Sequence, residues 1–434
     1  MKHAPADALT STLNRFFQRT NQGIRPGLDV IQALLQRLDQ PQRRYPYIHV
    51  AGTNGKGSVC AMLASVLRAA GYKTGCYTSP HLRTFNERIQ IDGAPIPDTD
   101  LAPLIDQVEA AADDLVSREK LRPASFFECA TAMAFTYFAQ QDVDWAVIET
   151  GMGGRWDATN IDTPALAVLT EIDMDHIRFL GPTIESIARE KAGIIKSRAP
   201  VVTGPLTEPV KSIIEKAVRD AATLHLYADE HVQIQRLRQS WEGQKIRITT
   251  DERACRPLVL PLIGRHQLAN AALAVAALET LAGANRIVLP DSALEQGLAE
   301  TRWPARCELL AEDPVTLLDV AHNPNGAQAL ARTLSELAGK QPIGMIIGFL
   351  DDKDVAGCVR VWAKRIARFW TVSIDDRRGL SADAVARIVA DTTDRPVTAM
   401  PLDQAKKSAR QWARAEGGIV CIAGSLFLAG EVMT

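Results

Sequence analysis

The chain has 434 residues, of which 46% are hydrophobic and 23% charged, and its formal net charge at pH 7 is −2. This length exceeds one ordinary hydrophobic core and predicts two or three domains. The near-neutral charge argues against nucleic acid or a membrane surface as a partner. Residues 1–15 lack the apolar core of a signal peptide, and no apolar run is long enough to span a bilayer, so we expect a cytoplasmic protein.

Seven cysteines are scattered along the chain without a C-x-x-C pair. Most lie in apolar contexts, which is typical of buried, reduced thiols rather than of disulfides or a zinc site. They are Cys60, Cys76, Cys129, Cys255, Cys307, Cys358 and Cys421. We assign no function to them.

The first informative stretch is 49-HVAGTNGKGSVCAMLASVL-67, where an apolar run, a glycine-rich turn and helical periodicity follow one another. Glycines at such a turn let several backbone N–H groups point at one anion, and the helix N-terminus adds partial positive charge. Lys56 would neutralise phosphate oxygens, and Ser58 could bind a magnesium ion. The stretch predicts a strand, a phosphate-binding turn and a helix.

The spacing within this turn differs from the general phosphate-loop pattern. Only two residues separate Gly52 from Gly55, and Gly57 stands between Lys56 and Ser58. On this pattern alone, a nucleotide site and an ordinary strand-to-helix turn are equally good interpretations.

Strand-like and helical runs alternate from Tyr45 onward, which predicts a parallel sheet with helices on both faces. The strands are predicted at residues 73–78, 144–149 and 166–171, and the helices at residues 125–141, 185–195, 267–281 and 292–300. Residues 232–250 alternate between polar and apolar side chains and predict a small antiparallel patch.

Polar side chains follow three predicted strands, at the edge where open α/β sheets bind their ligands. Ser79 begins the segment SPHL, Glu149 precedes GMGGRWDATN, and His176 lies within DMDHIRFLG. Hydroxyl, carboxylate and imidazole donors together suit Mg²⁺ or Mn²⁺. Each residue taken alone is more often structural, as a strand-end ion pair or a surface imidazole, but their shared position favours a site.

The helix predicted to include SIAREKAGIIK, at residues 186–196, carries several charges. The default interpretation is a solvated helix face. A lysine held beside a metal or phosphate site would instead have its pKa lowered, and the neutral amine could react with CO₂ to form a carbamate. Spacing alone does not distinguish Lys191 from Lys196.

A second α/β series follows the run 302-RWPAR-306, whose Trp and Pro between two periodic regions predict a linker. We therefore expect an N-terminal domain over residues 1–301, a linker over 302–306 and a smaller C-terminal domain over 307–434. The C-terminal strands are predicted at residues 316–320, 343–347, 369–373 and 419–422, and the helices at 326–337 and 382–389.

The stretch 319-DVAHNPNGAQAL-330 repeats the strand–turn–helix pattern. Asn323 before Pro324 is typical of a helix cap, which explains both of these residues. It does not explain Asp319 and His322, which we interpret as candidate contacts to a nucleotide.

Several motifs, in one order along nearly the whole chain, resemble those of the Mur-ligase superfamily and, within it, of the folylpolyglutamate synthase/dihydrofolate synthase family. The motifs are AGTNGKGS (51–58), SPHL (79–82), ERI (87–89), ETGMGGRWDATN (149–160), DHIRFLG (175–181), EKAGIIK (190–196), DVAHNP (319–324) and DKD (352–354). The resemblance implies a two-domain α/β fold: an N-terminal P-loop-type ATPase domain with a mostly parallel sheet, and a smaller Rossmann-like C-terminal α/β domain. The family's loop has this shorter form and binds ATP.

The resemblance also implies roles for individual residues. The implied ATP contacts are Gly55, Lys56, Gly57, Ser58, Asn270, Arg306, Asp319 and His322. The implied ligands of two magnesium ions are Ser79, Glu149 and His176. The implied pterin or folate contacts are Arg25, Pro26, Gly27, Leu28, Ser125, Phe126, Phe127, Glu128, Trp156, Asp157 and Ala158. The implied catalytic residues are Lys56, His176 and Lys191, the last as carbamylated N6-carboxylysine.

The implied reaction is ATP-dependent amide formation, in which a carboxylate of dihydropteroate or tetrahydrofolate becomes an acyl phosphate and is attacked by the amine of L-glutamate. We expect a monomer that binds ATP, Mg²⁺ and these small molecules, and neither nucleic acid nor a membrane. The alternatives are another Mur-superfamily ligase of the cell-wall type and a nucleotide-binding switch that does not ligate.

The chain departs from the family pattern at two places. Residues 304–306 read PAR where the family has PGR, so Arg306 is kept without its glycine neighbour. The pterin-contacting run at residues 25–28 is altered too, which makes the dihydropteroate contacts the least well supported part of the resemblance.

Overall fold

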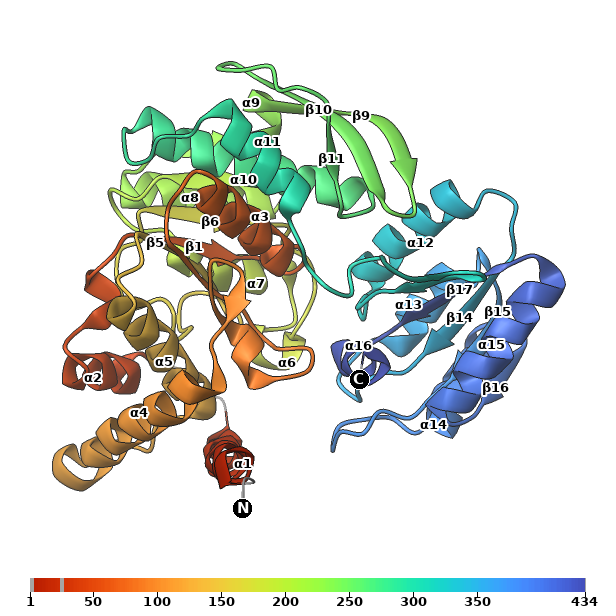
Figure 1. Cartoon of the computed structure of the whole chain (residues 1–434), viewed down its shortest axis with the longest axis horizontal. Coiled ribbons are helices and arrows are strands. Elements are labelled where there is room, and N and C mark those ends of the chain that lie inside the picture. Colours follow the sequence, from red (N-terminus) through yellow and green to blue (C-terminus); the bar gives the residue numbers. More distant parts are fainter. Residues whose placement is uncertain (1–3, 24–26, 434) are drawn as a thin grey trace. The chain divides into compact units, whose positions relative to one another are not determined.

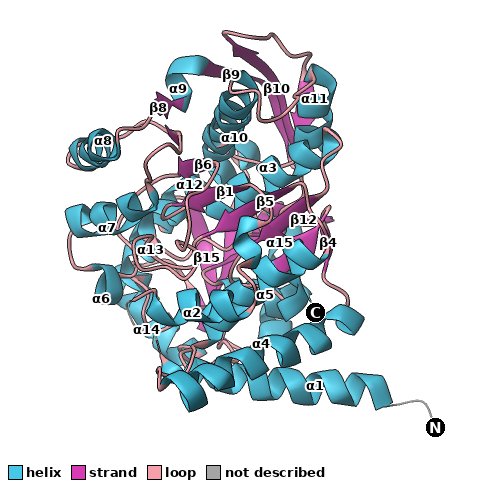
Figure 2. Cartoon of the chain, turned by 90° about the vertical axis from the view of Figure 1, so that its left-hand side faces the viewer, coloured by secondary structure: helices cyan, strands magenta, loops and turns pink. Residues whose placement is uncertain are grey.

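The computed structural model describes residues 4–23 and 27–433 of the chain. Figure 1 colours it along the sequence and Figure 2 by secondary structure. The chain divides into two compact units. Unit 1 comprises Met1–Gln233, Thr249–Arg253 and Asn270–Leu298, and unit 2 comprises Ile234–Ile248, Ala254–Ala269 and Ala299–Thr434. The predicted linker at residues 302–306 belongs to unit 2, and the predicted domain boundaries stay a prediction.

Unit 1 is built on an eight-stranded sheet in the order β4-β3-β2-β5-β1-β6-β7-β8. β3 and β4 join its edge in antiparallel fashion, and the other strands pair in parallel. The strands are β1 (Tyr47–Ala51), β2 (Thr74–Tyr77), β3 (Ile89–Ile91), β4 (Ala94–Pro95), β5 (Trp145–Glu149), β6 (Leu166–Leu169), β7 (Val201–Thr203) and β8 (His225–Tyr227). Every residue of β1, β5 and β6 is buried, as expected for parallel strands covered on both faces.

Helices supply the two apolar layers that cover this sheet. The helices of unit 1 are α1 (Ala4–Phe17), α2 (Asp29–Arg37), α3 (Lys56–Ala69), α4 (Asp98–Glu119), α5 (Phe126–Gln140), α6 (Ile177–Leu180), α7 (Ile184–Lys191), α8 (Val210–Ala221) and α9 (Ala228–His231). α10 (Arg265–Gly283) and α11 (Asp291–Glu300) lie mostly in this unit. Side chains of α1, α2, α4 and α5 share one core with β2 and β5, and side chains of α7 and α8 share another with β6 and β7.

A separate three-stranded sheet has the order β11-β10-β9. Its strands are β9 (Val232–Ser240), β10 (Gly243–Thr250) and β11 (Leu258–Leu260), and β10 pairs with β11 in antiparallel register. Apolar and polar residues alternate along β10, and the apolar ones are buried. The predicted antiparallel patch is therefore confirmed.

Unit 2 has a six-stranded sheet in the order β12-β13-β17-β14-β15-β16. Only the edge strand β12 is antiparallel to its neighbour among the described strands of this sheet. The strands are β12 (Glu308–Glu312), β13 (Val315–Leu318), β14 (Ile343–Ile347), β15 (Ile366–Thr371), β16 (Val397–Ala399) and β17 (Ile419–Ala423). The helices are α12 (Pro324–Ala338), α13 (Val355–Trp362), α14 (Ala382–Thr392), α15 (Leu402–Glu416) and α16 (Leu426–Met433).

The faces of this sheet alternate residue by residue. Ile419 and Cys421 of β17 share a core with side chains of α12, α13 and α14, whereas Val420 and Ile422 point to the other face, where α15 and α16 lie (Figure 1). Asn323 caps α12, because its Oδ1 accepts the N–H of Gly326 at 2.8 Å. The helix-cap interpretation of Asn323 is confirmed.

Two further expectations concern whole classes of residue. All seven cysteines are free and buried, as expected for apolar thiol positions. Among the helices that the structure describes, none is both long and apolar enough to cross a membrane.

Candidate active site

The glycine-rich turn lies between the end of β1 and the start of α3, as predicted. Gly55 precedes α3 with a φ of 87°, in the left-handed region that favours glycine. A Cβ at Gly55 would lie only 2.5 Å from Oδ1 of Asn270. A Cβ at Gly52 would lie 1.8 Å from Oγ1 of Thr170. The turn therefore approaches both side chains more closely than any other residue type allows, and Asn270 lies directly against it.

Hydrogen bonds tie the turn to the segment that follows β6. The N–H of Thr53 donates to the carbonyl of Glu171 (2.7 Å), and the hydroxyl of Thr53 donates to the carbonyl of Asp173 (2.9 Å). From β6's side, Oγ1 of Thr170 donates to the carbonyl of Asn54 (2.7 Å). These bonds fix the backbone path of the turn before any ligand binds.

Three of the predicted residues meet at the C-terminal ends of adjacent parallel strands. Nζ of Lys56 donates to the carbonyl of Thr53 (3.2 Å) and lies 4.0 Å from Oε1 of Glu149. Glu149 ends β5 and is 4% exposed, and its Oε2 accepts the N–H of Ser79 at 3.1 Å. A buried carboxylate thus faces the lysine of the turn and the first residue of SPHL.

His176 lies on the loop after β6, at the start of α6, with a φ of 50°. Its Nε2 lies 3.7 Å from Oδ2 of Asp175, and its ring is partly exposed. Within residues 4–23 and 27–433, no group of three or more His, Cys, Asp or Glu side chains is placed to hold a metal ion. Glu149 and Ser79 do lie together, since the N–H of Ser79 donates to the Glu149 carboxylate. A carboxylate and a hydroxyl are oxygen ligands of the kind that Mg²⁺ prefers, so these two residues fit that ion.

Lys191 ends α7 and is buried, although its segment has the pattern of a charged helix face. Its Nζ donates to the carbonyl of Gly52 in the glycine-rich turn at 2.6 Å. Burial, and then the charge of Lys56, lower the pKa of Lys191 to about 7, against the opposite effect of Asp175 and Asp157. The solvated-face interpretation is therefore wrong for Lys191.

The loop at residues 151–160 is shaped from inside by Asp157. This buried carboxylate accepts the N–H of Met152 (2.8 Å) as well as the N–H and hydroxyl of Thr159 (3.0 and 2.5 Å). Burial raises the pKa of Asp157, and these hydrogen bonds act in the opposite direction. Ala158 is buried beside it, whereas Trp156 is 52% exposed. Of the three, Trp156 presents the largest surface to a ligand.

Residues at the start of α5 either hold the helix end in place or pack on the loop at residues 151–160. Ser125 caps the helix, and Glu128 accepts from the N–H and hydroxyl of Ser125 and from both Nη atoms of Arg122, each at 2.8 Å. The ring of Phe127 instead packs on Gly151, where a Cβ would lie 2.4 Å from its Cζ. The predicted substrate segment therefore touches the loop at residues 151–160.

The remaining predicted pterin contacts are less informative. Phe126 lies in a cluster of aromatic rings. Gly27 and Leu28 lead into α2. Arg25 and Pro26 lie outside the described residues.

Unit 2 has its own polar cluster after β13. Asp319 is buried, and its two carboxylate oxygens accept the N–H groups of Cys307 (2.8 Å) and Ala321 (2.7 Å). Burial raises the pKa of Asp319, whereas the charge of Arg306 lowers it. Nδ1 of His322 lies 2.8 Å from the carbonyl of Val320 and donates to it.

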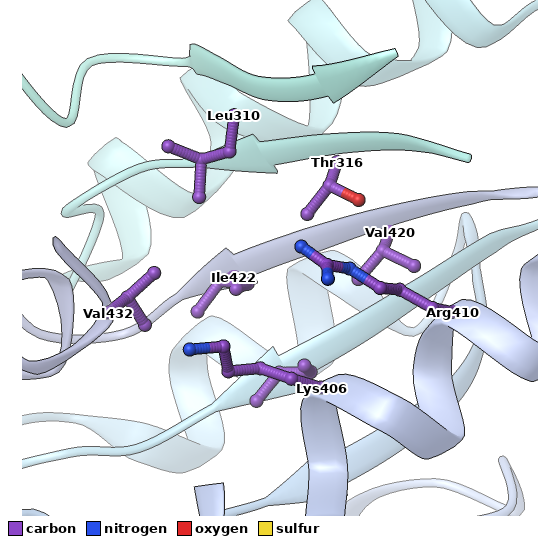
Figure 3. A pocket seen from close by; sticks show the side chains of 8 residues that line it. Leu310, Thr316, Lys406, Arg410, Val420, Ile422 and Val432 are labelled. Carbon is purple, nitrogen blue, oxygen red and sulfur yellow. The ribbon is translucent and has the colours of Figure 1, made fainter. Parts of the chain in front are cut away.

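A cavity of about 250 Å³ lies on the face of the six-stranded sheet of unit 2 that α15 and α16 cover (Figure 3). Figure 3 shows the apolar side chains of Leu310, Val420, Ile422 and Val432 around the cavity, with the amine of Lys406 and the guanidinium of Arg410 extending among them from α15. The lining residues are Leu310, Thr316, Ile346, Lys406, Arg410, Val420, Ile422 and Val432. None of them belongs to the predicted site.

Sequence reasoning missed two side chains of unit 1. Nε of Arg88 donates to Nδ1 of His81 at 2.8 Å, and both residues are largely shielded from solvent. They occur in the motifs ERI and SPHL, which contributed to the resemblance without a role for either residue. An arginine shortly after the candidate metal segment SPHL was the available signal.

Comparison with known proteins gives matches along most of the chain. Residues 120–278 match the Mur ligase middle domain, and residues 305–426 match the Mur ligase, glutamate ligase domain. The dihydrofolate synthase/folylpolyglutamate synthase of Bacillus subtilis is 40% identical over 345 residues, which cover 79% of this chain and 80% of that protein. Its Escherichia coli counterpart is 32% identical over 429 residues, covering 99% and 95%.

Comparison with solved structures gives proteins of the same kind. The Mycobacterium tuberculosis folylpolyglutamate synthase complexed with ADP and AMPPCP has a TM-score of 0.90 at 33% identity, with 99% of this chain and 98% of that chain covered. The Escherichia coli enzyme in complex with DHPP and ADP has a TM-score of 0.85 at 30% identity, with 98% and 96% covered.

The fold, the phosphate-type turn and the two matched domains define an ATP-dependent ligase with a Mur-ligase architecture. Relatives that are 32–40% identical over most of the chain identify the family within this class. The chain belongs to the dihydrofolate synthase/folylpolyglutamate synthase family. The resemblance read from the motifs and the two-unit α/β fold that it implied are confirmed, and the non-ligating switch is excluded.

Proposed function

We propose that the chain joins L-glutamate to a carboxylate of dihydropteroate, giving dihydrofolate, and to tetrahydrofolate polyglutamates, releasing ADP and phosphate. The observation that carries the proposal is the convergence of Lys56, the buried carboxylate of Glu149 and the buried amine of Lys191 on one glycine-rich turn. The activities in the names of the relatives support the choice of acyl substrates.

The turn is the proposed ATP site. Its glycine geometry lets backbone N–H groups converge on phosphate oxygens, and α3 begins there with its positive dipole end. The proposed contacts at the turn are Gly55, Lys56, Gly57, Ser58 and Asn270 of unit 1. The family resemblance implies further nucleotide contacts at Arg306, Asp319 and His322. The complexes of two relatives with ADP support this proposal.

Ser79, Glu149 and His176 are the proposed ligands of two Mg²⁺ ions. When bound, Mg²⁺ would neutralise the charge that the phosphates develop during phosphoryl transfer. The N–H of Ser79 holds the Glu149 carboxylate in one orientation, and Lys56 supplies a positive charge on its other side.

Lys191 is the proposed site of carbamylation. Its pKa of about 7 leaves a large neutral fraction at physiological pH. The amine nitrogen would form a bond to the carbon of CO₂ and release a proton to solvent, leaving an anion near Lys56. In protein kept with carbon-13 bicarbonate, we expect a carbamate NMR signal that disappears in Lys191→Ala and persists in Lys196→Ala. Persistence of the signal in Lys191→Ala would refute this assignment.

Amide formation then needs two substitutions. An oxygen of the substrate carboxylate forms a bond to the γ-phosphorus, while the bond from that phosphorus to the bridging oxygen breaks and ADP departs. The amine of glutamate next bonds to the acyl carbon, phosphate leaves with its electron pair, and the nitrogen loses a proton. Lys56 lies at the turn that would hold the phosphates, where its charge stabilises both anionic leaving groups.

The pterin part of the substrate is proposed to lie against Phe127 and Trp156. Phe127 packs on Gly151, and Trp156 is the exposed aromatic side chain of the same loop. Asp157 and Glu128 are proposed to shape this surface from below, since both are saturated by internal hydrogen bonds. A monomeric state and a cytoplasmic location remain part of the proposal.

The direct test is ADP release by the purified protein with ATP and Mg²⁺. We expect release that requires both L-glutamate and an acyl acceptor, with dihydropteroate and tetrahydrofolate assayed separately. Release that ignores glutamate, or that responds to neither acceptor, would contradict the proposed function. Activity with one acceptor only would restrict the proposal to that substrate.

A further inference from the structure

A buried cation without a carboxylate partner lies beside the proposed site. Arg88 ends the 3₁₀ helix η3 (Phe85–Arg88) just before β3, and it is 7% exposed. Among the residues that the structure describes, no Asp or Glu forms an ion pair with it. Arginine keeps its charge in proteins, so this site holds a buried positive charge. Burying a charge without a counter-ion is costly.

The contacts of Arg88, which include a side-chain hydrogen bond with Tyr77, orient the guanidinium without neutralising it. Its Nε donates to Nδ1 of His81 at 2.8 Å, and its Cζ lies 5.3 Å from the ring centre of Phe126 and 5.7 Å from that of Phe85. Because Nε of arginine can only donate, Nδ1 of His81 accepts, and the neutral ring carries its proton on Nε2. Arg88 and His81 thus form a rigid pair of hydrogen-bond donors.

The nearest carboxylates are engaged elsewhere. Glu87 accepts the backbone N–H groups of residues 82–84 at 2.7, 3.0 and 2.9 Å, which fixes the turn after SPHL. Glu149 interacts electrostatically with Arg88, but its oxygens face the N–H of Ser79 and the amine of Lys56. Neither Glu87 nor Glu149 forms an ion pair with Arg88, although both interact with it electrostatically, so a ligand carboxylate would be its direct counter-ion.

We propose that Arg88, together with His81, binds the carboxylate of the acyl substrate that is to be phosphorylated. This inference rests on the proposed function, which requires an anionic carboxylate close to the turn. A planar guanidinium matches a carboxylate in geometry and charge. Arg88 also stacks on Phe126, inside the segment proposed to face the substrate, and lies in electrostatic range of Glu149.

Arg88 and His81 would act by positioning. With one carboxylate oxygen held by the guanidinium, the other oxygen is presented to the γ-phosphorus. The aromatic rings of Phe85 and Phe126 shield the pair from water, which strengthens charge-assisted hydrogen bonds to the ligand.

Equilibrium binding of dihydropteroate tests this role without depending on turnover. We expect Arg88→Gln to weaken binding by about 10- to 100-fold, because a charge-assisted hydrogen bond is lost. Arg88→Lys should fall between wild type and Arg88→Gln, since it keeps the charge but not the planar fork. Arg83→Gln is the matched control, because Arg83 is an exposed arginine of the same segment, and it should bind as wild type does.

The primary amide of dihydropteroate separates carboxylate binding from general damage. It has no negative charge, so wild type and Arg88→Gln should bind it with affinities within about two-fold of each other. Equal weakening of acid and amide in Arg88→Gln, or unchanged binding of the acid, would overturn the inference. Carboxylate binding that depends on Arg88 without glutamate-dependent ADP release would instead contradict the proposed function alone.

Discussion

At the glycine-rich turn, the amine of Lys56 lies 4.0 Å from the buried carboxylate of Glu149. In Lys56→Ala the glycines still form the turn, but the charge of the phosphates goes unmatched. We expect glutamate-dependent ADP release to fall by at least about 100-fold, with the thermal unfolding midpoint close to that of wild type. A folded Lys56→Ala variant with near-normal turnover would show that the turn does not bind the reacting phosphates.

Lys191 should make stability depend on pH. Its pKa falls from 10.5 to about 7 on folding, so the unfolded chain binds more protons there between these two values. The free energy of unfolding therefore rises with pH across this window and levels off below about pH 7. We expect the free energy of unfolding of wild type to rise relative to that of Lys191→Met, by up to about 1.4 kcal/mol per pH unit between about pH 7 and 9. Urea unfolding in CO₂-free buffer measures it, and a constant difference would contradict the buried-amine account.

A network of side-chain hydrogen bonds holds the N-terminus of α5 in place. Glu128 joins the capping box of Ser125 to the guanidinium of Arg122 through hydrogen bonds of 2.8 Å. Glu128→Ala should lower the free energy of unfolding by about 2–4 kcal/mol, because it leaves a partly buried cation and capping groups unpaired. Asp220→Ala in the exposed Lys216–Asp220 pair of α8 is the control and should change it by less than about 0.5 kcal/mol. Equal effects in chemical denaturation would refute the structural role of Glu128.

Elements with short, buried, apolar strands could be predicted closely from the sequence. β14 has the predicted bounds, Ile343–Ile347, because Pro342 and Gly348 flank an unbroken apolar run. α4 was not predicted, although its buried residues recur at helical spacing, because Pro103 interrupts the pattern. α15 was missed because its buried residues are alanines, which give little contrast with the polar face.

Some residues of the candidate site could likewise be predicted from the sequence, and others could not. The phosphate turn is local in sequence, so the glycines and Lys56 could be recognised directly. The burial of Lys191 could not, because its partner Gly52 is 139 residues away in the chain. The lack of a carboxylate at Arg88 is likewise a property of the folded chain, since Glu87 is its neighbour in sequence but faces three backbone N–H groups.

At the scale of the whole molecule, each unit has its own sheet and its own polar residues after a parallel strand. Unit 1 carries the turn after β1 and Glu149 at the end of β5, and unit 2 carries Asp319 and His322 after β13. Both sets follow the rule that α/β sheets bind ligands at the C-terminal ends of their strands. The match to the Mur ligase, glutamate ligase domain lies within unit 2, and most of the match to the Mur ligase middle domain lies within unit 1.

The central claim is that the chain activates a substrate carboxylate as an acyl phosphate and transfers the acyl group to glutamate. Dihydropteroate labelled with oxygen-18 in its carboxylate tests this claim most directly, with mass spectrometry of both products. The account predicts dihydrofolate formation with one labelled oxygen in each phosphate released. Glutamate incorporation with unlabelled phosphate, or no ligation of dihydropteroate or tetrahydrofolate, would contradict it.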